Sequence, residues 1–289
     1  MQVRAGAVTL EVDDRGPRGG EPVLLIMGLG MQLTAWPEAL VDDLVARGHR
    51  VIRFDNRDAG LSQGFDHLGV PNMAAAGVRW WLRLPVRAPY TLADMAQDTR
   101  ALMDALGVDR ARVCGASMGG MIAQHLAARH PERVSRLTLM MSSRGARGLP
   151  QARLQVRLAL MSRPKGPGTE GVVRHLEHLF GLIGSPGYRP APEQLRQRLQ
   201  ASVARAWRPA GTARQLCAVV ADGDRGPLLQ RITAPTVVVH GRDDALIPPA
   251  HGEDLARHVP GARLVLIPGM GHDLPDALLP RFAETISNP

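Results

Sequence analysis

The chain has 289 residues, of which 45% are hydrophobic and 21% charged, enough apolar side chains for a large core. This composition excludes a disordered chain, a collagen-like repeat and a coiled coil, and no apolar run approaches the roughly 20 residues of a membrane helix. We therefore expect no membrane partner, and because the first residues lack the apolar stretch of a secretory signal, we expect a cytoplasmic protein. Having only Cys114 and Cys217, the chain is expected to hold neither a disulfide framework nor a cysteine metal cluster.

The net charge of +8 comes from a single segment. Residues 142–228 contain 13 Arg and one Lys against three Glu and two Asp, whereas the rest of the chain is almost neutral. The segment matches no nucleic-acid-binding motif and has few aromatic side chains, so we expect a solvated basic face and no nucleic-acid partner.

Short apolar, β-branched runs alternate along the chain with stretches whose apolar residues recur at helical spacing. This alternation predicts an α/β fold with a mostly parallel central sheet flanked by helices. The expected strands are residues 8–12, 23–27, 51–54, 112–115, 137–141, 236–240 and 264–267. The expected helices are residues 36–47, 92–106, 118–129, 251–258 and 274–286.

The alternation stops between residues 142 and 228, where the sequence predicts helices and no strand. The expected helices are residues 151–161, 172–183 and 193–207. A helical block between two strands of a parallel sheet usually lies above the strand ends, where ligands bind. We therefore expect a core formed by residues 1–141 and 229–289 and a helical cap, or lid, formed by residues 142–228.

A Gly-x-Ser-x-Gly pattern joins an expected strand to an expected helix at Gly115-Ala116-Ser117-Met118-Gly119. A nucleophile on such a strand-turn-helix has a strained backbone, and the flanking glycines prevent side-chain collisions. The turn would expose the Ser117 hydroxyl beside the positive end of the following helix. The pattern predicts a catalytic serine at position 117, against the alternative of a chance glycine-rich turn.

A serine nucleophile needs a base, and the base needs a carboxylate to orient it. His272 is the best candidate base among ten histidines, because it follows the last expected strand in a glycine-rich loop. Asp243 and Asp244 both follow the preceding strand, and the residues alone do not choose between them. The chain order serine, aspartate, histidine is the one expected with a strand-turn-helix nucleophile of this kind, and it differs from the orders of chymotrypsin and subtilisin.

Acyl transfer also needs N–H groups that stabilise the oxyanion. The backbone N–H of Met118 is one candidate, and the N–H of Leu29, in the loop after the second expected strand, is the other. The same loop contains Gly28-x-Gly30, but Leu33 stands where a dinucleotide fingerprint needs its third glycine, so we expect no cofactor.

Three other patterns are weaker functional candidates. Ser162-x-x-Lys165 is a possible nucleophile pair, but the Pro and Gly residues around it oppose the helix start that such a serine needs. His175 and His178 are spaced as two metal ligands on a helix, or as a solvated face, and no third ligand is apparent. His240 ends an expected strand and is interpreted as a packed or capping histidine.

Four stretches together resemble the α/β-hydrolase superfamily, and within it the aclacinomycin methylesterase-like hydrolases. They are LLIMG at 24–28, RFDNRDAGLS at 53–62, GASMGG at 115–120 and IPGMGH at 267–272. In that family the acid is the aspartate of Gly-x-x-Asp followed by an apolar residue and proline, which corresponds to Gly241, Asp244, Ile247 and Pro248. The resemblance therefore favours Asp244 over Asp243. It also implies that residues 55–62 form a buried structural network, although their charge invites a functional interpretation.

These observations predict a cofactor-independent carboxylic ester hydrolase that acts on a small to medium apolar ester through an acyl-enzyme. A C–C bond hydrolase, an enol-lactone hydrolase or a perhydrolase would share the same triad, and a non-catalytic receptor on this scaffold is a further alternative. A basic cap would favour acidic esters.

The methionines beside the strand ends either line the pocket or fill the core, and Trp80 and Trp81 form either a pocket wall or a buried helix face.

Overall fold

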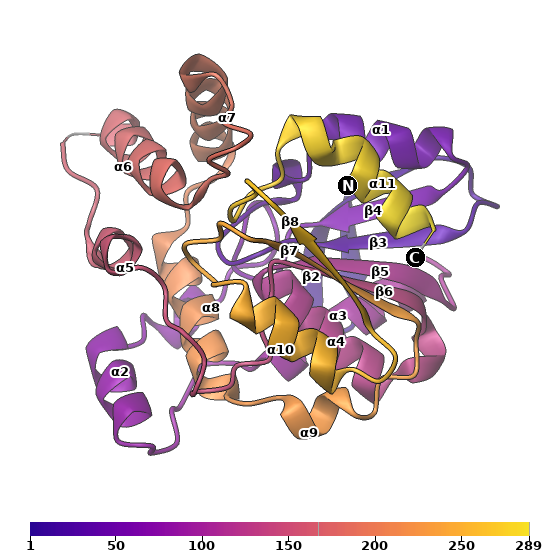
Figure 1. Cartoon of the computed structure of the whole chain (residues 1–289), viewed down its shortest axis with the longest axis horizontal. Helices are drawn as coiled ribbons and strands as arrows, with labels where there is room; N and C mark the ends of the chain where they lie inside the picture. The colour runs from indigo at the N-terminus through magenta and orange to yellow at the C-terminus, as the bar shows by residue number, and fades with distance from the viewer. Residues whose placement is uncertain (167, 289) are drawn as a thin grey trace.

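An eight-stranded sheet crosses the centre of the computed structural model, which describes residues 1–166 and 168–288 (Figure 1). The strand order is β1-β2-β4-β3-β5-β6-β7-β8; the β1–β2 and β2–β4 pairs are antiparallel and all later pairs are parallel. The strands are β1 (Gln2–Ala5), β2 (Val8–Arg15), β3 (Pro22–Ile26), β4 (Arg50–Phe54), β5 (Ala111–Ala116), β6 (Val134–Met140), β7 (Thr236–Gly241) and β8 (Arg263–Ile267). The carboxyl ends of β3 to β8 therefore lie at one edge, the place where open α/β sheets bind ligands.

Helices cover both faces of the sheet, so its central strands are buried on both sides. Helices α1 (Glu38–Ala46) and α11 (Leu279–Ser287) pack on one face (Figure 1). Helices α3 (Leu92–Ala105), α4 (Met118–Arg129) and α10 (Ala250–His258) pack on the other. Short 3-10 turns occur at Leu33–Ala35, Asp66–Leu68, Pro131–Arg133 and Asp276–Leu278.

Between β6 and β7 the chain leaves the sheet, and the described residues there, 141–166 and 168–235, form helices and no strand. They are α5 (Leu154–Met161), α6 (Gly168–Ile183), α7 (Pro192–Arg205), α8 (Pro209–Asp222) and α9 (Gly226–Leu229). Figure 1 shows α5, α6 and α7 beyond one end of the sheet, with α8 between them and the strands. One more helix, α2 (Met73–Trp81), follows β4 and lies at the same end of the molecule.

All the expected strands and helices are present, and the differences have local causes. The last helix begins at Leu279 instead of residue 274, because the segment between Pro275 and Pro280 forms a 3-10 turn. Strand β1 is not among the expected strands, since only one of its four residues is buried and its pattern is weak. Helices α2 and α8 are likewise additional to the expected elements.

Both cysteines are free and buried, and burial raises the pKa of each thiol. Buried thiols of this kind are unreactive. Within residues 1–166 and 168–288, no helix has both the length and the apolar character needed to cross a membrane.

Candidate active site

Ser117 stands between strand β5 and helix α4 with φ 55° and ψ −119°, a strained conformation for a residue other than glycine. Glycine is required two residues before and two residues after Ser117. A Cβ atom at Gly115 would lie 2.3 Å from the Gly119 carbonyl oxygen, and one at Gly119 would lie 2.0 Å from a carbonyl oxygen of β3. The turn presents the Ser117 side chain at the edge where the parallel strands end.

The structure brings Ser117, His272 and Asp244 into one chain of hydrogen bonds. His272 Nε2 lies 3.0 Å from Ser117 Oγ, and His272 Nδ1 lies 2.7 Å from Asp244 Oδ2. The Asp244 side chain is fully buried and that of His272 is 8% exposed. A proton on Nδ1, donated to the carboxylate, leaves Nε2 free to accept the serine proton, which is the arrangement of a serine nucleophile with its base and orienting acid.

Asp244 is itself held in place by the loop that follows it. Its Oδ1 atom accepts hydrogen bonds from the N–H groups of Leu246 and Ile247, at 2.9 and 2.8 Å. Its Oδ2 atom also lies 3.5 Å from Nε2 of His240. The expected packed role of His240 is correct, because the ring is buried, bonds to the Ile247 carbonyl oxygen at 2.8 Å, and has a pKa lowered by burial. Its proximity to Asp244 is an additional finding of the structure.

The neighbouring Asp243 points elsewhere. Its Oδ2 atom accepts a hydrogen bond of 2.8 Å from the N–H of Gly269, and its own N–H donates to the Met270 carbonyl oxygen at 3.0 Å. Asp243 therefore fixes the loop that precedes His272, whereas Asp244 contacts the imidazole.

Two backbone N–H groups are available beside the serine. Gly28 packs so closely on Ser117 that a Cβ atom there would lie 3.1 Å from the serine Cβ, which places the loop containing Leu29 next to the nucleophile. In the part of the chain that the structure describes, neither the Leu29 nor the Met118 N–H donates a hydrogen bond. Free donors beside a nucleophile are what an oxyanion site needs.

The loop that carries Leu29 is anchored by helix α8. Gln215 Oε1 accepts a hydrogen bond of 2.8 Å from the Gly30 N–H, and Gln215 Nε2 donates to the Arg57 carbonyl oxygen at 2.7 Å. The side chain is buried, and Gly30 also packs on Thr212, so closely that a Cβ atom would lie 2.7 Å from Thr212 Oγ1. Sequence reasoning misses this contact, because α8 is not among the expected helices and glutamine has no characteristic spacing.

The histidine loop is anchored by helix α6. The His272 N–H donates to the Ile183 carbonyl oxygen at 2.7 Å, and Ser185 Oγ accepts from the Gly271 N–H at 2.8 Å. Ser185 also donates to the half-buried carboxyl of Asp273, and partial burial raises the pKa of that carboxyl although the serine bonds oppose the rise. The segment 142–228 thus fixes both loops that flank the serine.

The charged loop after β4 forms the buried network that the family resemblance implies. Asp58 accepts two hydrogen bonds from Arg214 at 2.7 and 2.8 Å and one from Tyr90 at 2.7 Å. Arg57 pairs with Asp98 at 2.6 Å. These ions are buried and paired, which is the condition under which charges persist near a core. The loop is therefore structural, and it ties α8 to the sheet.

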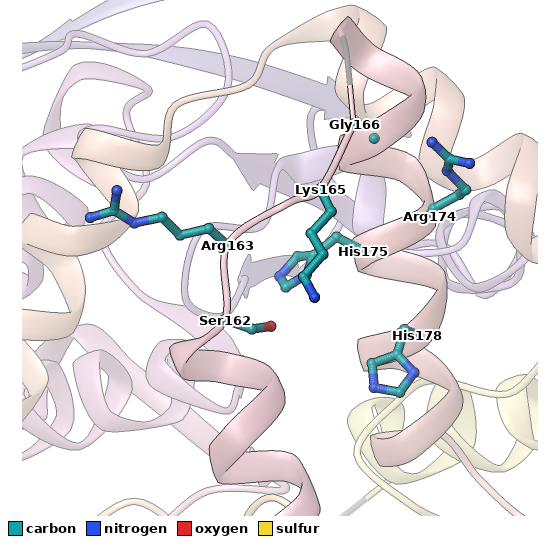
Figure 2. A pocket seen from close by; sticks show the side chains of 8 residues that line it. Ser162, Arg163, Lys165, Gly166, Arg174, His175 and His178 are labelled. Carbon is teal, nitrogen blue, oxygen red and sulfur yellow. The ribbon is translucent and has the colours of Figure 1, made fainter.

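The weaker candidates lie apart from Ser117, in the segment 142–228. Ser162, Lys165, His175 and His178 line a surface pocket of about 540 Å³ between α5 and α6 (Figure 2). Ser162 Oγ donates to the Ala159 carbonyl oxygen at 2.8 Å, so it only closes the helix end. Across residues 1–166 and 168–288, no group of three or more His, Cys, Asp or Glu side chains is arranged to hold a metal.

The methionines and tryptophans divide between core and surface. Five of the six methionines near the strand ends are buried and one is half-buried, which supports the interpretation that they fill the core: Met27, Met31, Met118, Met121, Met140 and Met141. Trp80 is half-buried beneath the Arg147 guanidinium, whereas Trp81 is 75% exposed. The interpretation of Trp81 as part of a buried helix face is therefore wrong.

Comparison with known proteins identifies the family. The family model described as alpha/beta hydrolase fold matches residues 21–276. Rhodomycin D methylesterase DauP of Streptomyces sp. (strain C5) is 30% identical over 298 residues, which cover 96% of this chain and 94% of that protein. Rhodomycin D methylesterase DnrP of Streptomyces peucetius is 29% identical with the same coverage.

Solved structures agree with this assignment. The meta-cleavage product hydrolase CumD from Pseudomonas fluorescens IP01 has a TM-score of 0.76 and 21% identity, covering 99% of this chain and 95% of its own, and shows the fold alone. Est816, an N-acyl homoserine lactone degrading enzyme, has a TM-score of 0.70 and 26% identity, covering 99% and 98%. The chain belongs to the α/β-hydrolase fold family and, within it, resembles the aclacinomycin methylesterase-like hydrolases.

Proposed function

We propose that this protein is a serine hydrolase that cleaves a carboxylic ester through an acyl-enzyme. The observation that carries the proposal is the continuous chain Ser117–His272–Asp244, with heavy-atom distances of 3.0 and 2.7 Å, beside two N–H groups that have no acceptor within residues 1–166 and 168–288. A receptor would need none of these groups in this arrangement. The methylesterase relatives favour a methyl ester as the substrate.

In the first half of the reaction, Ser117 Oγ attacks the ester carbonyl carbon while His272 Nε2 accepts the hydroxyl proton. Asp244 holds the imidazole by Nδ1 and stabilises the positive charge that forms. The N–H groups of Leu29 and Met118 bind the oxyanion, and the loss of one such donor typically costs about 3 kcal/mol of barrier. His272 then protonates the leaving alcohol, which departs and leaves the acyl group on Ser117.

In the second half, water replaces the alcohol. His272 accepts a proton from the water, the resulting hydroxide attacks the acyl carbonyl, and the proton passes to Ser117 Oγ as the acid leaves. No cofactor enters either half. In this proposal, residues 142–228 form a cap on the core of residues 1–141 and 229–289, because their helices contact both the oxyanion loop and the histidine loop.

The proposal is tested with a substrate panel. Hydrolysis is measured for p-nitrophenyl esters from acetyl to long acyl chains and for methyl esters of aromatic acids, with the natural protein and with Ser117→Ala. We expect ester turnover that has a chain-length optimum and disappears in the variant. If the folded protein leaves every ester intact but cleaves a vinylogous diketone or an enol lactone, the reaction is that of the C–C or lactone hydrolases instead.

A further inference from the structure

Helices α2 and α5, which stand outside the sheet, each expose an apolar stripe. The exposed residues are Val78 and Trp81 on α2, Leu82 directly after it, and Leu154, Leu158, Leu160 and Met161 on α5. All except Leu160 recur at spacings of three, four or seven residues, which places each of the two sets on one side of its helix. The largest exposures are 75% for Trp81 and 81% for Met161, which is unusual for such large apolar side chains.

The charges around these stripes are of one sign. Residues 71–89 and 142–169, which contain the two helices, include eight Arg and Lys165 but no Asp or Glu. Of these nine cations, only Arg144 forms an ion pair within residues 1–166 and 168–288. Other arginines of the segment 142–228 are neutralised, as Arg196 is by Glu170 and Glu177. The excess positive charge of the protein is therefore concentrated where apolar side chains are exposed.

The segments that contain the two helices contact each other. The Arg147 guanidinium, in the segment that leads to α5, lies 5.0 Å from the centroid of the Trp80 ring in α2. Figure 1 shows α2 and α5 at the same end of the molecule, remote from most of the sheet. Arg163, just after α5, is one of the residues that line the pocket, and Figure 2 shows its side chain extending away from those of Lys165 and His175.

We propose that α2 and α5 form a docking surface for an anionic lipid bilayer. Exposed apolar residues between long cationic side chains are typical of helices that lie in the membrane interface, and tryptophan is enriched at that depth. A layer of lipid phosphates matches residues 71–89 and 142–169, which contain no carboxylate and, among the residues that the structure describes, eight cations without an ion-pair partner. Such a contact would be peripheral and differs from our expectation of no membrane partner, which rests on the lack of a spanning segment. It does not depend on the proposed ester hydrolysis.

Co-sedimentation of the full chain with vesicles tests the proposal. We expect binding to phosphatidylcholine vesicles that contain about a third phosphatidylglycerol, and little binding to pure phosphatidylcholine, with a loss of affinity at high salt. The variant Arg157→Gln/Arg163→Gln should bind about 25-fold more weakly, because each cation near an anionic surface contributes a factor of roughly five to the affinity. The affinity of the variant Trp81→Ser/Met161→Ser for these vesicles should fall about tenfold or more.

Matched controls separate this surface from net charge and general hydrophobicity. Arg231→Gln/Arg263→Gln removes the same charge from exposed positions elsewhere, and Trp207→Ser removes an exposed tryptophan outside the two stripes. Both controls should bind within about twofold of the natural protein. The proposal is overturned if anionic vesicles do not bind, if the controls weaken binding as much as the test variants, or if Trp81 and Met161 mediate self-association in the absence of lipid.

Discussion

The side chain of Gln215 accepts a hydrogen bond of 2.8 Å from the N–H of Gly30, the residue that follows the proposed oxyanion donor Leu29. The same amide donates to the Arg57 carbonyl oxygen at 2.7 Å, so one buried side chain connects helix α8 to the loops after β3 and β4. The peptide between Leu29 and Gly30 is thereby held by helix α8. Gln215 is a positioning residue, because it acts on the oxyanion through the loop.

Replacing this side chain is expected to affect the chemical step more than binding. Gln215→Ala should lower kcat about ten- to hundredfold with little change in KM, since complete loss of an oxyanion donor costs about 10²–10³ in kcat. Steady-state kinetics on a p-nitrophenyl ester measure this split, after circular dichroism has shown that the variant is folded. Gln197→Ala, at an exposed position of α7, is the control and should leave both constants unchanged. An unchanged kcat in folded Gln215→Ala contradicts the positioning role.

The two adjacent aspartates allow a matched comparison. Asp244→Asn retains the shape but removes the charge that orients His272, so kcat/KM should fall by about 10⁴. Asp243→Asn alters only the bond to the Gly269 N–H, and its kcat/KM should fall less than about tenfold. Equal losses in the two variants would show that the aspartates act on the histidine loop alone and that Asp244 has no separate role.

The buried pair of Asp58 and Arg214 predicts a specific pH dependence of stability. Burial acts to raise the pKa of Asp58, but hydrogen bonds from Arg214, the Phe65 N–H and Tyr90 lower it below its ordinary value of 3.8. A lowered carboxyl pKa stabilises the fold above the unfolded-state value, and this contribution is lost as the pH falls through the folded-state value. Urea unfolding should therefore show a larger difference between natural protein and Asp58→Asn at pH 7 than at pH 3. A difference that grows on acidification contradicts the assigned shift.

The same substitution is expected to have opposite effects on stability at Gly119, in the turn around Ser117, and at Gly181, in helix α6. A Cβ atom at Gly119 would lie 2.0 Å from a backbone oxygen, so Gly119→Ala should lower the free energy of unfolding by about 1–3 kcal/mol or more, the usual cost of overpacking. At Gly181, in α6, an added Cβ atom would meet no other atom within 4 Å, and Gly181→Ala should raise the free energy of unfolding by about 0.5–1 kcal/mol. Denaturant unfolding measures both effects. A stable, active Gly119→Ala variant would contradict the close packing of the turn around Ser117.

The parts of the fold that are predicted correctly are those with strong local patterns. The parallel strands are continuous apolar runs between breakers, and the Ser117 turn has glycines at the positions that sterics require. His272 is identified because it follows the last strand, and Asp244 because of a family pattern. The structure places the side chains of both within hydrogen-bonding distance of each other.

The parts that sequence reasoning misses depend on contacts between distant segments. Gln215 lies 185 residues from Gly30 in sequence, and Ser185 lies 86 residues from Gly271. No periodicity or spacing relates such pairs, and α8 itself packs on helices α2 and α3. The same limit applies to Trp81, whose exposure depends on what the fold leaves uncovered.

The central claim is that Ser117 forms the covalent intermediate, and labelling with a fluorophosphonate followed by intact-mass and peptide mass spectrometry tests it most directly. We predict one adduct per chain, located on Ser117, with labelling abolished in Ser117→Ala and strongly slowed in Asp244→Asn. An adduct on another residue, or an unlabelled but folded natural protein, would contradict the account and remove the basis for an acyl-enzyme.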